Sequence, residues 1–303
     1  MIAVDWGTSS LRLYRLDESG LVRERRRSDC GAMASTGRFG DVLAQETAGW
    51  NDTRILMCGM VGGRGGWREV PYLDCPAGNA ELAQGMQRIE AAGFEGRELW
   101  IVPGLCDTVS DTVPDVMRGE EAQLAALLDV LPGGAHLVCL PGTHSKWVTV
   151  HDGLIRRIAT AMTGEVYAIL RQHSILGQSM PSAEVRFDAY AFDAGLKRSA
   201  QPDGLLHHLF GVRTSRLFRL FDEAALPSYL SGILIGHEIR ASGLFSQSPR
   251  PVQVHLIGNE RLLSSYAHAL TALGIGVQRH PEELAARGLH ALWARRVEAG
   301  TAA

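Results

Sequence analysis

Two short turns rich in glycine and hydroxyl side chains, far apart in the sequence, constrain the fold of this chain more than any other feature. The first is Gly7-Thr8-Ser9-Ser10 and the second is Gly142-Thr143-His144-Ser145. Each lies between two segments in which apolar residues follow one another or alternate with polar ones, as they do in buried and half-buried strands. The same hairpin is therefore expected to begin two halves of the chain.

The elements predicted around each turn also follow one order. In the first half, three strands precede a helix, a strand, a helix, a strand and a helix, at residues 2–4, 11–16, 21–27, 39–50, 54–59, 79–92, 99–103 and 120–130. In the second half, three strands are again expected, at residues 136–140, 146–151 and 154–158, before a longer helical region. We therefore predict an α/β protein of two duplicated βββαβαβα domains, residues 1–118 and 119–303. Ligands of open α/β sheets bind at the carboxyl ends of strands, so a cleft between the domains is the expected ligand site.

Composition and charge exclude several functional classes. Lys and Arg number 30 against 33 Asp and Glu, which gives a net charge of −3 and no reason to expect a nucleic-acid partner. No apolar stretch approaches the roughly twenty residues that cross a membrane. The start of the chain lacks the pattern of a secretory signal, and the five cysteines are dispersed like free thiols, so we expect a cytoplasmic protein. No P-loop, dinucleotide-binding or nucleophile-elbow motif is present.

Asp5 and the two turns form a pattern that suits a nucleotide and a metal ion. Asp5 ends the first strand, so its carboxylate can face Mg²⁺ while Gly7, Thr8 and Ser9 meet phosphate oxygens. The second turn offers further groups for the same purpose, from Gly142, Thr143, Ser145 and Lys146. The alternatives are that the first hairpin is purely structural and that Lys146 is an ordinary exposed strand residue.

Four longer strings give the chain a family resemblance: Ile101-Val102-Pro103-Gly104-Leu105-Cys106, Val116-Met117-Arg118-Gly119-Glu120-Glu121-Ala122-Gln123-Leu124, Pro141-Gly142-Thr143-His144-Ser145-Lys146-Trp147-Val148 and Met162-Thr163-Gly164-Glu165. Together with the first hairpin they resemble the 2-dehydro-3-deoxygalactonokinases, which are sugar kinases of the actin-like ATPase superfamily, and the match spans nearly the whole chain. The resemblance implies two ribonuclease-H-like domains with a nucleotide cleft between them. It also implies that ATP, with Mg²⁺, phosphorylates 2-dehydro-3-deoxy-D-galactonate at its 6-hydroxyl in galactonate catabolism.

The resemblance further implies which residues are catalytic. Glu120 lies where related sugar kinases carry an acid that follows a glycine at the start of a helix and serves as the general base. Glu121, beside it, is a second candidate, and Asp5 completes the catalytic set. Because a helix N-terminus keeps a carboxylate ionised, as a base must be, we favour Glu120. The alternative is that both glutamates only stabilise the start of the helix.

Two more segments are implied to bind the substrates. The glycine-rich loop at residues 59–67 lies where such a kinase places its acceptor, so that Gly62, Arg64 and Trp67 become candidate sugar-acid contacts. Arg64 would pair with the substrate carboxylate and Trp67 would cover a C–H face, whereas the alternative places Arg64 in solvent and Trp67 in the core. Gly258-Asn259 resembles the adenosine-binding turn, although a glycine that only ends a strand explains it nearly as well.

The motifs leave two rival functions open. One is a kinase for another small sugar acid or polyol, and the other is an actin-like ATPase without a small-molecule acceptor. We expect a small sugar acid as the binding partner, and neither nucleic acid nor membrane. The sequence leaves the oligomeric state open, with a homodimer as one alternative.

Overall fold

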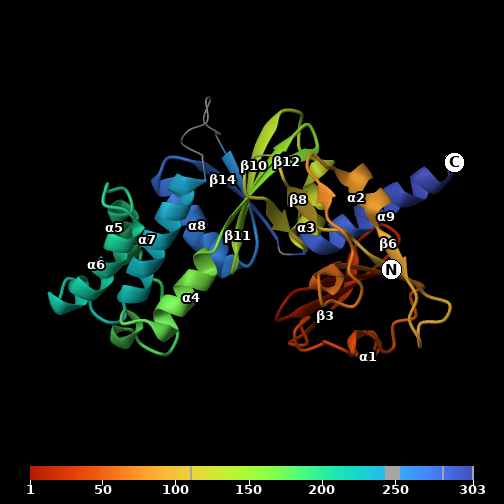
Figure 1. The fold of residues 1–303 in the computed structure, drawn as a ribbon, viewed down its shortest axis with the longest axis horizontal. Coiled ribbons are helices and arrows are strands. Elements are labelled where there is room, and N and C mark those ends of the chain that lie inside the picture. The colour runs from red at the N-terminus through yellow and green to blue at the C-terminus, as the bar shows by residue number, and fades with distance from the viewer. Residues whose placement is uncertain (110, 243–252, 282, 302–303) are drawn as a thin grey trace. The chain divides into compact units, whose positions relative to one another are not determined.

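A computed structural model describes residues 1–109, 111–242, 253–281 and 283–301 of the chain, which pack into two compact units. Unit 1 comprises Met1–His136, Val148–Ile158 and Pro281–Ala303, and unit 2 comprises Leu137–Trp147 and Ala159–His280. Both units combine strands with helices (Figure 1). Each unit is discontinuous in sequence, and the predicted division into functional domains after residue 118 stays a prediction.

The main sheet of unit 1 has six strands in the order β3-β2-β1-β4-β7-β6. They are β1 (Ile2–Trp6), β2 (Leu11–Leu16), β3 (Val22–Ser28), β4 (Arg54–Gly59), β6 (Gln87–Ile89) and β7 (Glu98–Ile101). Strand β4 runs parallel to both β1 and β7, whereas β1–β2, β2–β3 and β6–β7 are antiparallel pairs. Every residue of β1 is buried, as expected of a central strand covered on both faces. Asp5 is the one charged residue in this strand.

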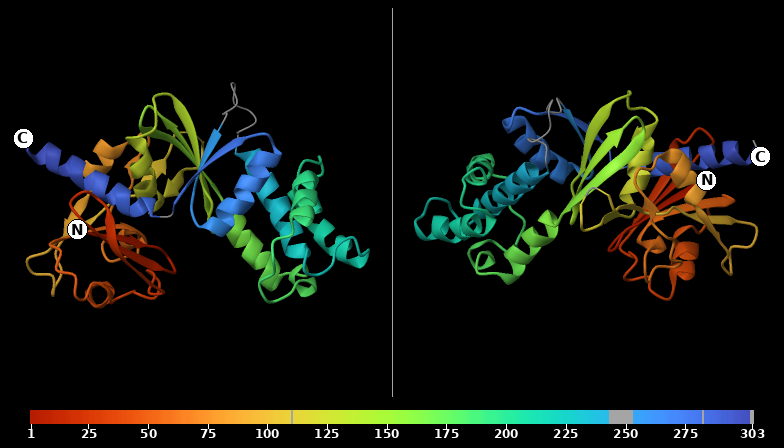
Figure 2. Two further views of the ribbon diagram at one scale, coloured as in Figure 1. Left: turned by 180° about the vertical axis from the view of Figure 1, so that it is seen from behind. Right: turned by 45° about the horizontal axis from the view of Figure 1, so that its top comes forward.

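A second, smaller sheet in unit 1 has the order β5-β8-β9, with β5 (Leu73–Asp74), β8 (Leu105–Asp107) and β9 (Asp115–Met117). The helices of the unit are α1 (Phe39–Glu46), α2 (Asn79–Gly85), α3 (Glu120–Leu128) and α9 (Leu284–Thr301), and a 3₁₀ turn at Met60–Gly62 follows β4. The C-terminal helix α9, blue in Figure 2, packs against α2 and α3. The end of the chain thus supports the helix that begins with Glu120.

The remaining strands form a five-stranded sheet in the order β12-β11-β10-β13-β14. They are β10 (Ala135–Leu140), β11 (Ser145–His151), β12 (Leu154–Ala161), β13 (Gln253–Ile257) and β14 (Gly276–His280). The two large sheets share one strand order. In the first, β3 lies at the edge and is followed by β2, β1, β4 and β7, with β6 added beyond β7. In the second, β12 lies at the edge and is followed by β11, β10, β13 and β14. This shared order confirms the duplicated α/β architecture.

Helices make up most of the rest of unit 2: α4 (Thr163–His173), α5 (Ala189–Arg198), α6 (Leu205–Leu217), α7 (Leu226–Ala241) and α8 (Glu260–Ala272), with a 3₁₀ turn at Gly177–Ser179. Helix α7 contacts α4, α5, α6 and α8, and most of its residues are buried (Figure 1). It approaches α5 closely because glycines stand at the contact. A Cβ on Gly195 would lie 2.2 Å from the Tyr229 carbonyl oxygen, and one on Gly232 would lie 2.1 Å from that of Phe192.

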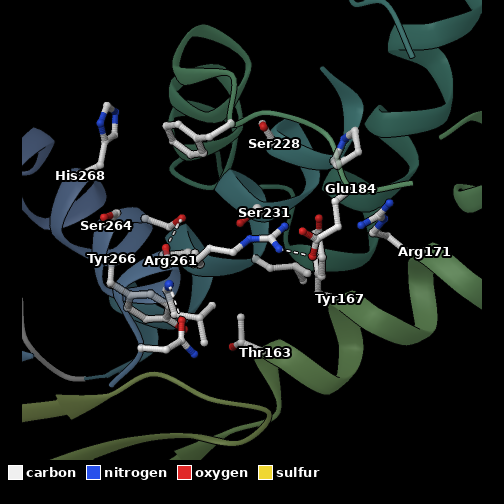
Figure 3. A pocket seen from close by; sticks show the side chains of 18 of the residues that line it. Thr163, Tyr167, Arg171, Glu184, Ser228, Ser231, Arg261, Ser264, Tyr266 and His268 are labelled. Carbon is white, nitrogen blue, oxygen red and sulfur yellow. Dashed lines mark hydrogen bonds and ion pairs between the residues drawn. The ribbon is translucent and has the colours of Figure 1, made fainter. Parts of the chain in front are cut away.

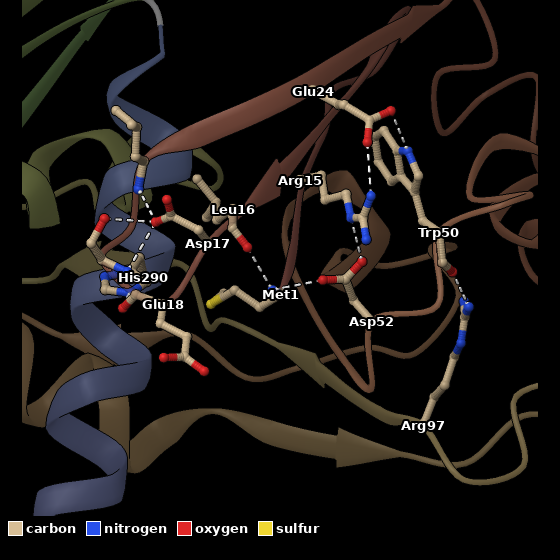
Figure 4. A network of polar contacts seen from close by, with 12 residues as sticks. Met1, Arg15, Leu16, Asp17, Glu18, Glu24, Trp50, Asp52, Arg97 and His290 are labelled. Atoms are coloured by element: carbon tan, nitrogen blue, oxygen red, sulfur yellow. Dashed lines mark hydrogen bonds and ion pairs between the residues drawn. The ribbon is translucent and has the colours of Figure 1, made fainter.

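A polar network fixes the start of the chain to the main sheet of unit 1 (Figure 4). The Met1 ammonium donates hydrogen bonds to the Leu16 carbonyl at 2.8 Å and to the Asp52 carboxylate at 3.0 Å. Arg15 bridges Asp52 and Glu24, with both contacts at 2.8 Å. Burial raises the pKa of Asp52, but the N-terminal ammonium and Arg15 outweigh it, so that this pKa lies below its ordinary value. Asp52 therefore stabilises the fold as an anion.

One predicted helix is wrong in its second half. The segment 79–92 begins as α2 at Asn79 but ends at Gly85, and Gln87–Ile89 forms β6, antiparallel to β7. Pairing with a neighbouring strand overrides the helical pattern there. The sheet β5-β8-β9 was not predicted, because its strands of two or three residues are too short to show a period.

Across the described ranges, none of the helices combines the length and apolarity needed to span a bilayer.

Candidate active site

Asp5 lies near the end of β1, between the two strands that pair with it. Its Cα partner on β2 is Arg12 and its Cα partner on β4 is Cys58. The Arg12 Nη1 atom donates to Asp5 Oδ2 at 2.9 Å, and Asp5 is 7% exposed. Hairpin pairing after the first turn thus brings a cation to the predicted metal ligand, and this contact was not predicted from the sequence.

The first turn presents its hydroxyl side chains to solvent. Its backbone is closed by a hydrogen bond from the Gly7 N–H to the Ser10 carbonyl at 2.9 Å. A second contact fixes it from outside, because the Ala32 N–H donates to the Gly7 carbonyl at 2.9 Å. Thr8 and Ser9 are exposed, so their hydroxyls and N–H groups can reach a ligand. This geometry favours the predicted phosphate contacts of Gly7, Thr8 and Ser9, which stay predictions.

The two glutamates at the start of α3 lie in different environments. Glu121 is 0% exposed, its Oε2 accepts from the Gly119 N–H at 2.6 Å, and its Oε1 has no hydrogen-bond partner. Burial, and then the charge of Glu120, raise the pKa of Glu121 to about 8. Glu120 is half-buried, and its carboxylate accepts from the Arg118 N–H at 3.1 Å. At neutral pH the buried glutamate is therefore mostly protonated.

The three predicted catalytic carboxylates gather around one buried thiol. Burial raises the pKa of Cys58, and the charges of Asp5, Glu121 and Glu120 raise it further. The two glycines at this place meet as well, since a Cβ on Gly119 would lie 3.2 Å from the Gly59 Cα. Gly119 has a φ of +114°, which L side chains rarely adopt. The end of β4 and the start of α3 thus come together with Asp5 at one place in unit 1.

The glycine-rich loop packs beside this group of carboxylates. Gly62 is buried, and a Cβ there would lie 2.8 Å from Ile101 Cγ2 and 3.1 Å from Arg118 Nη1. Trp67 stacks on Phe39 with ring centroids 6.4 Å apart and meets the edge of Phe94. Arg64 is exposed. The packing of Trp67 favours a place in the core, and the substrate contacts of Gly62, Arg64 and Trp67 stay predictions.

The second turn, in unit 2, rests on a buried chain of hydroxyl groups. Ser145 is 0% exposed, and its Oγ lies 2.9 Å from the Tyr266 hydroxyl and 3.4 Å from the Gly142 nitrogen, which donates to it. Tyr266 donates to Glu238 Oε2 at 2.6 Å, and Trp147 Nε1 donates to Glu238 Oε1 at 2.8 Å. Ser145 therefore supports the turn from beneath.

The other two predicted ligands of this turn differ in their exposure. Thr143 is exposed, so its hydroxyl can meet a ligand directly. Lys146 is 7% exposed and its Nζ donates to Thr160 Oγ1 at 2.8 Å, so it is not the exposed strand residue of the alternative interpretation. Phosphate contacts of Gly142, Thr143, Ser145 and Lys146 stay predictions.

A pocket of about 660 Å³ opens beside the second turn and lies within unit 2 (Figure 3). Gly142, Gly164, Asn259 and Tyr266 are among its lining residues. Asn259 caps α8, because its side chain accepts from the Leu262 N–H at 3.1 Å. The N-terminus of α8 therefore faces a pocket that also reaches the second turn, a combination that suits an anionic ligand.

An ion pair joins Arg261 of α8 to Glu184, and Tyr167 and Arg171 of α4 also line the pocket (Figure 3). Apolar and aromatic walls with a few polar groups are typical of sites for small organic ligands. Gly258, just before α8, has a φ of +156° and brings the chain close to the Pro141 carbonyl. Asn259 lines the pocket and Gly258 precedes it, and the nucleotide contacts predicted for both residues stay predictions.

Comparison with known proteins identifies the family. The model of the 2-keto-3-deoxy-galactonokinase family matches residues 5–292. The chain belongs to this family. A curated protein of Rhizobium meliloti (strain 1021), named "Probable 2-dehydro-3-deoxygalactonokinase DgoK1", is 38% identical over 91% of this chain and 90% of its own length. The 2-dehydro-3-deoxygalactonokinase of Escherichia coli (strain K12) is 34% identical over 91% of both chains.

Solved structures support the family fold. A crystal structure from Sinorhizobium meliloti, assigned as a 2-dehydro-3-deoxygalactonokinase, matches this chain with a TM-score of 0.88 and 36% identity over 98% of both chains. The activator of 2-hydroxyisocaproyl-CoA dehydratase from Clostridium difficile matches with a TM-score of 0.53 and 11% identity, over 99% of this chain and 97% of its own. That second likeness extends to the fold alone. The predicted actin-like, doubled α/β fold is confirmed.

Several side chains of this family member were not foreseen from its sequence. Arg12, Glu238 and Tyr266 contact or support predicted site residues, yet none of them lies in a recognisable motif, whereas Arg118 lies in the string that contains Glu120. Arg12 had a signal, because it follows the first turn on the facing strand of a short hairpin. Glu238 and Tyr266 are brought to the site by packing between segments far apart in sequence, whereas Arg118 is two residues before Glu120.

Proposed function

We propose that this chain transfers the terminal phosphate of ATP to the 6-hydroxyl of 2-dehydro-3-deoxy-D-galactonate. The observation that carries the proposal is the family match over residues 5–292, which span Asp5, the glycine-rich loop, Glu120 and the pocket of unit 2. Kinases need little covalent chemistry from the protein and depend on positioning and on electrostatic stabilisation. The carboxylates of unit 1 and the anion-suited pocket of unit 2 supply groups for both tasks.

Glu120 is the proposed general base. It is half-buried and stands in the first turn of α3, where the helix dipole favours the ionised carboxylate. Glu121 is the weaker candidate because it is fully buried and, with a pKa of about 8, mostly neutral at pH 7. A base must reach the hydroxyl whose proton it accepts, and a half-buried carboxylate can do so. We therefore assign the proton of the 6-hydroxyl to Glu120.

The pocket of unit 2 is the proposed nucleotide site. Its volume of about 660 Å³ suits a nucleoside, and the helix terminus capped by Asn259 favours phosphate oxygens. Gly142 lines this pocket and Thr143 is the next residue, so their N–H groups and the Thr143 hydroxyl are the proposed phosphate contacts. Tyr266 and Glu238 keep this turn in position from beneath.

Asp5 is the proposed contact to Mg²⁺. The described parts of the chain hold no group of three metal-ligating side chains, which fits a metal that arrives with the nucleotide rather than one in a protein cage. A single carboxylate such as Asp5, partly neutralised by Arg12, suits that arrangement. When bound, the ion would neutralise negative charge on the transferred phosphate. Arg12 holds the Asp5 carboxylate in place.

The proposed setting is galactonate catabolism in the cytoplasm, with a small sugar acid as the partner and a homodimer as one alternative for the assembly. The test is ADP release by the purified chain with Mg²⁺ and ATP, in the presence of 2-dehydro-3-deoxygalactonate, its gluconate-derived epimer or galactonate. We expect strong dependence on the first acid. Release that is indifferent to all three acids would contradict the assigned substrate and favour an actin-like ATPase.

A further inference from the structure

Arg118 carries a guanidinium group that the protein leaves largely unsatisfied. Its Nη2 donates to the Val70 carbonyl at 2.8 Å, whereas Nε and Nη1 are buried and have no hydrogen-bond partner. Three of the five N–H bonds of this side chain therefore lack an acceptor. Within the described ranges, no carboxylate forms an ion pair with it. Arg118 as a residue is half-buried, but buried N–H groups without an acceptor are costly, and such groups are retained where a ligand completes them.

The surroundings hold this guanidinium in one orientation. It lies over the Tyr72 ring, with the Cζ atom 4.1 Å from the ring centroid. The glycine-rich loop also lies close to the Arg118 side chain, since a Cβ on Gly62 would lie 3.1 Å from Nη1 and one on Gly63 would lie 3.6 Å from Cδ. Stacking and the bond to Val70 fix the group before any ligand binds, which lowers the entropic cost of recognition.

Arg118 is also connected to the proposed general base. It follows the last residue of β9 and precedes Gly119 at the start of α3, and its backbone N–H donates to the Glu120 carboxylate at 3.1 Å. The same residue thus contacts the base through its backbone and the acceptor loop through its side chain. A ligand group bound by the guanidinium would be fixed relative to Glu120.

We propose that Arg118 binds the carboxylate of the acceptor and thereby selects sugar acids over neutral sugars. This inference rests on the proposed function, because it names the residue that recognises one part of the proposed substrate. A planar guanidinium suits a carboxylate better than any other side chain does. Gly62 and Gly63 lie beside this guanidinium and carry no side chain that could serve as its acceptor, so the Nε and Nη1 donors remain for a ligand.

Arg64 is the competing candidate in the same loop. Its side chain is exposed, so a contact with a carboxylate there would be made in water, where such ion pairs contribute little. A neutral analogue would leave the buried donors of Arg118 unpaired, whereas it would leave Arg64 hydrated. Strong rejection of neutral acceptors is therefore expected from Arg118 and weak rejection from Arg64.

The test compares two acceptors across four variants. One acceptor is 2-dehydro-3-deoxygalactonate, and the other is its neutral analogue with a hydroxymethyl group in place of the carboxylate. In the unmodified protein we expect kcat/KM to favour the acid at least about 100-fold. Arg118→Met should lower kcat/KM for the acid about 100-fold, chiefly through KM, and leave both the neutral analogue and the KM for ATP within about threefold. Arg118→Lys, which keeps the charge but not the planar fork, should recover part of the preference.

Arg68→Met is the matched control, because Arg68 is an exposed arginine next to the same loop that has no place in the site. It should retain the full preference for the acid. If Arg118→Met and Arg118→Lys both keep the preference of the unmodified protein, the assignment is overturned, and a loss of preference in Arg64→Met would move the role to that residue. Should Arg118→Met fail to fold, Arg118→Lys alone decides between these results. If the unmodified protein phosphorylates no sugar acid, the proposed function fails, and this inference fails with it.

Discussion

The buried carboxyl of Glu121 makes the stability of unit 1 depend on pH in a direction opposite to that of most acidic residues. Burial and the charge of Glu120 raise its pKa from an ordinary 4.5 to about 8. Between these two values the folded chain binds one proton more than the unfolded chain does, so the free energy of unfolding falls as pH rises. The stabilisation that this bound proton gives the folded state is fully present below about pH 4.5 and is lost by about pH 8.

The variant Glu121→Gln removes this titration while keeping the shape of the side chain and an oxygen that can accept from the Gly119 N–H. One proton corresponds to about 1.4 kcal/mol per pH unit. Between pH 5.5 and 7.5 the free energy of unfolding of the unmodified protein should therefore fall by about 2.7 kcal/mol relative to that of the variant. The amide places an N–H₂ where Oε1 had no partner. This changes the variant's free energy of unfolding by a constant amount but does not change how that free energy depends on pH.

Urea unfolding followed by tryptophan fluorescence measures this difference. Trp6, Trp50, Trp67, Trp100 and Trp293 lie in unit 1, and only Trp147 lies in unit 2, so the signal reports mainly the unit that contains Glu121. Histidines and other acids titrate in both proteins and cancel in the comparison. A difference between the two proteins that stays constant from pH 5.5 to 7.5 would refute a buried, protonated Glu121.

Three further variants test two other parts of the site and the polar network at the start of the chain. Glu120→Gln should lower kcat by a factor of about 10² to 10⁴ with nucleotide binding unchanged, as measured by ADP release and by equilibrium binding, and full activity would remove Glu120 as the base. Tyr266→Phe takes the hydroxyl from between Ser145 and Glu238, so the KM for ATP should rise while that for the acceptor stays constant, and equal changes in both would contradict a role confined to the second turn. Asp52→Asn should cost on the order of 1 kcal/mol at pH 7. That deficit should vanish as pH falls below about 3.8, because the lowered pKa of Asp52 stabilises the fold only where the carboxylate is ionised, and a deficit that persists in acid would show that charge is not its cause.

The repeated hairpin predicted most of the architecture because it is a local signal. A turn between two alternating segments specifies a β-hairpin wherever it occurs, and its recurrence at Gly7 and Gly142 predicts the duplication that the two sheets share. Helix α3 begins at Glu120 as expected from the glycine before it. Strand β6 was missed because its residues pair with β7, and such pairing cannot be read from the segment itself.

The sequence anticipates the exposure of the candidate site residues only where they lie in turns, and their ligand contacts stay predictions. Thr8, Ser9 and Thr143 are exposed in the structure, as phosphate ligands should be. Ser145 and Lys146 appear equivalent to them in sequence, yet both are buried against hydroxyl partners from other segments. The difference between a residue that can touch a ligand and one that supports the turn depends on packing, which one sequence does not record. The same limit concealed the two buried guanidinium nitrogens of Arg118 that have no hydrogen-bond partner.

The position of the transferred phosphate tests the central claim most directly. The purified chain is incubated with Mg²⁺, ATP and 2-dehydro-3-deoxygalactonate, and the product is followed by ¹³C and ³¹P nuclear magnetic resonance. We predict one phosphorylated product whose phosphorus couples to C6, formed in a one-to-one ratio with ADP. ADP formed without a phosphorylated sugar acid, or a phosphate attached at another carbon, would contradict the account.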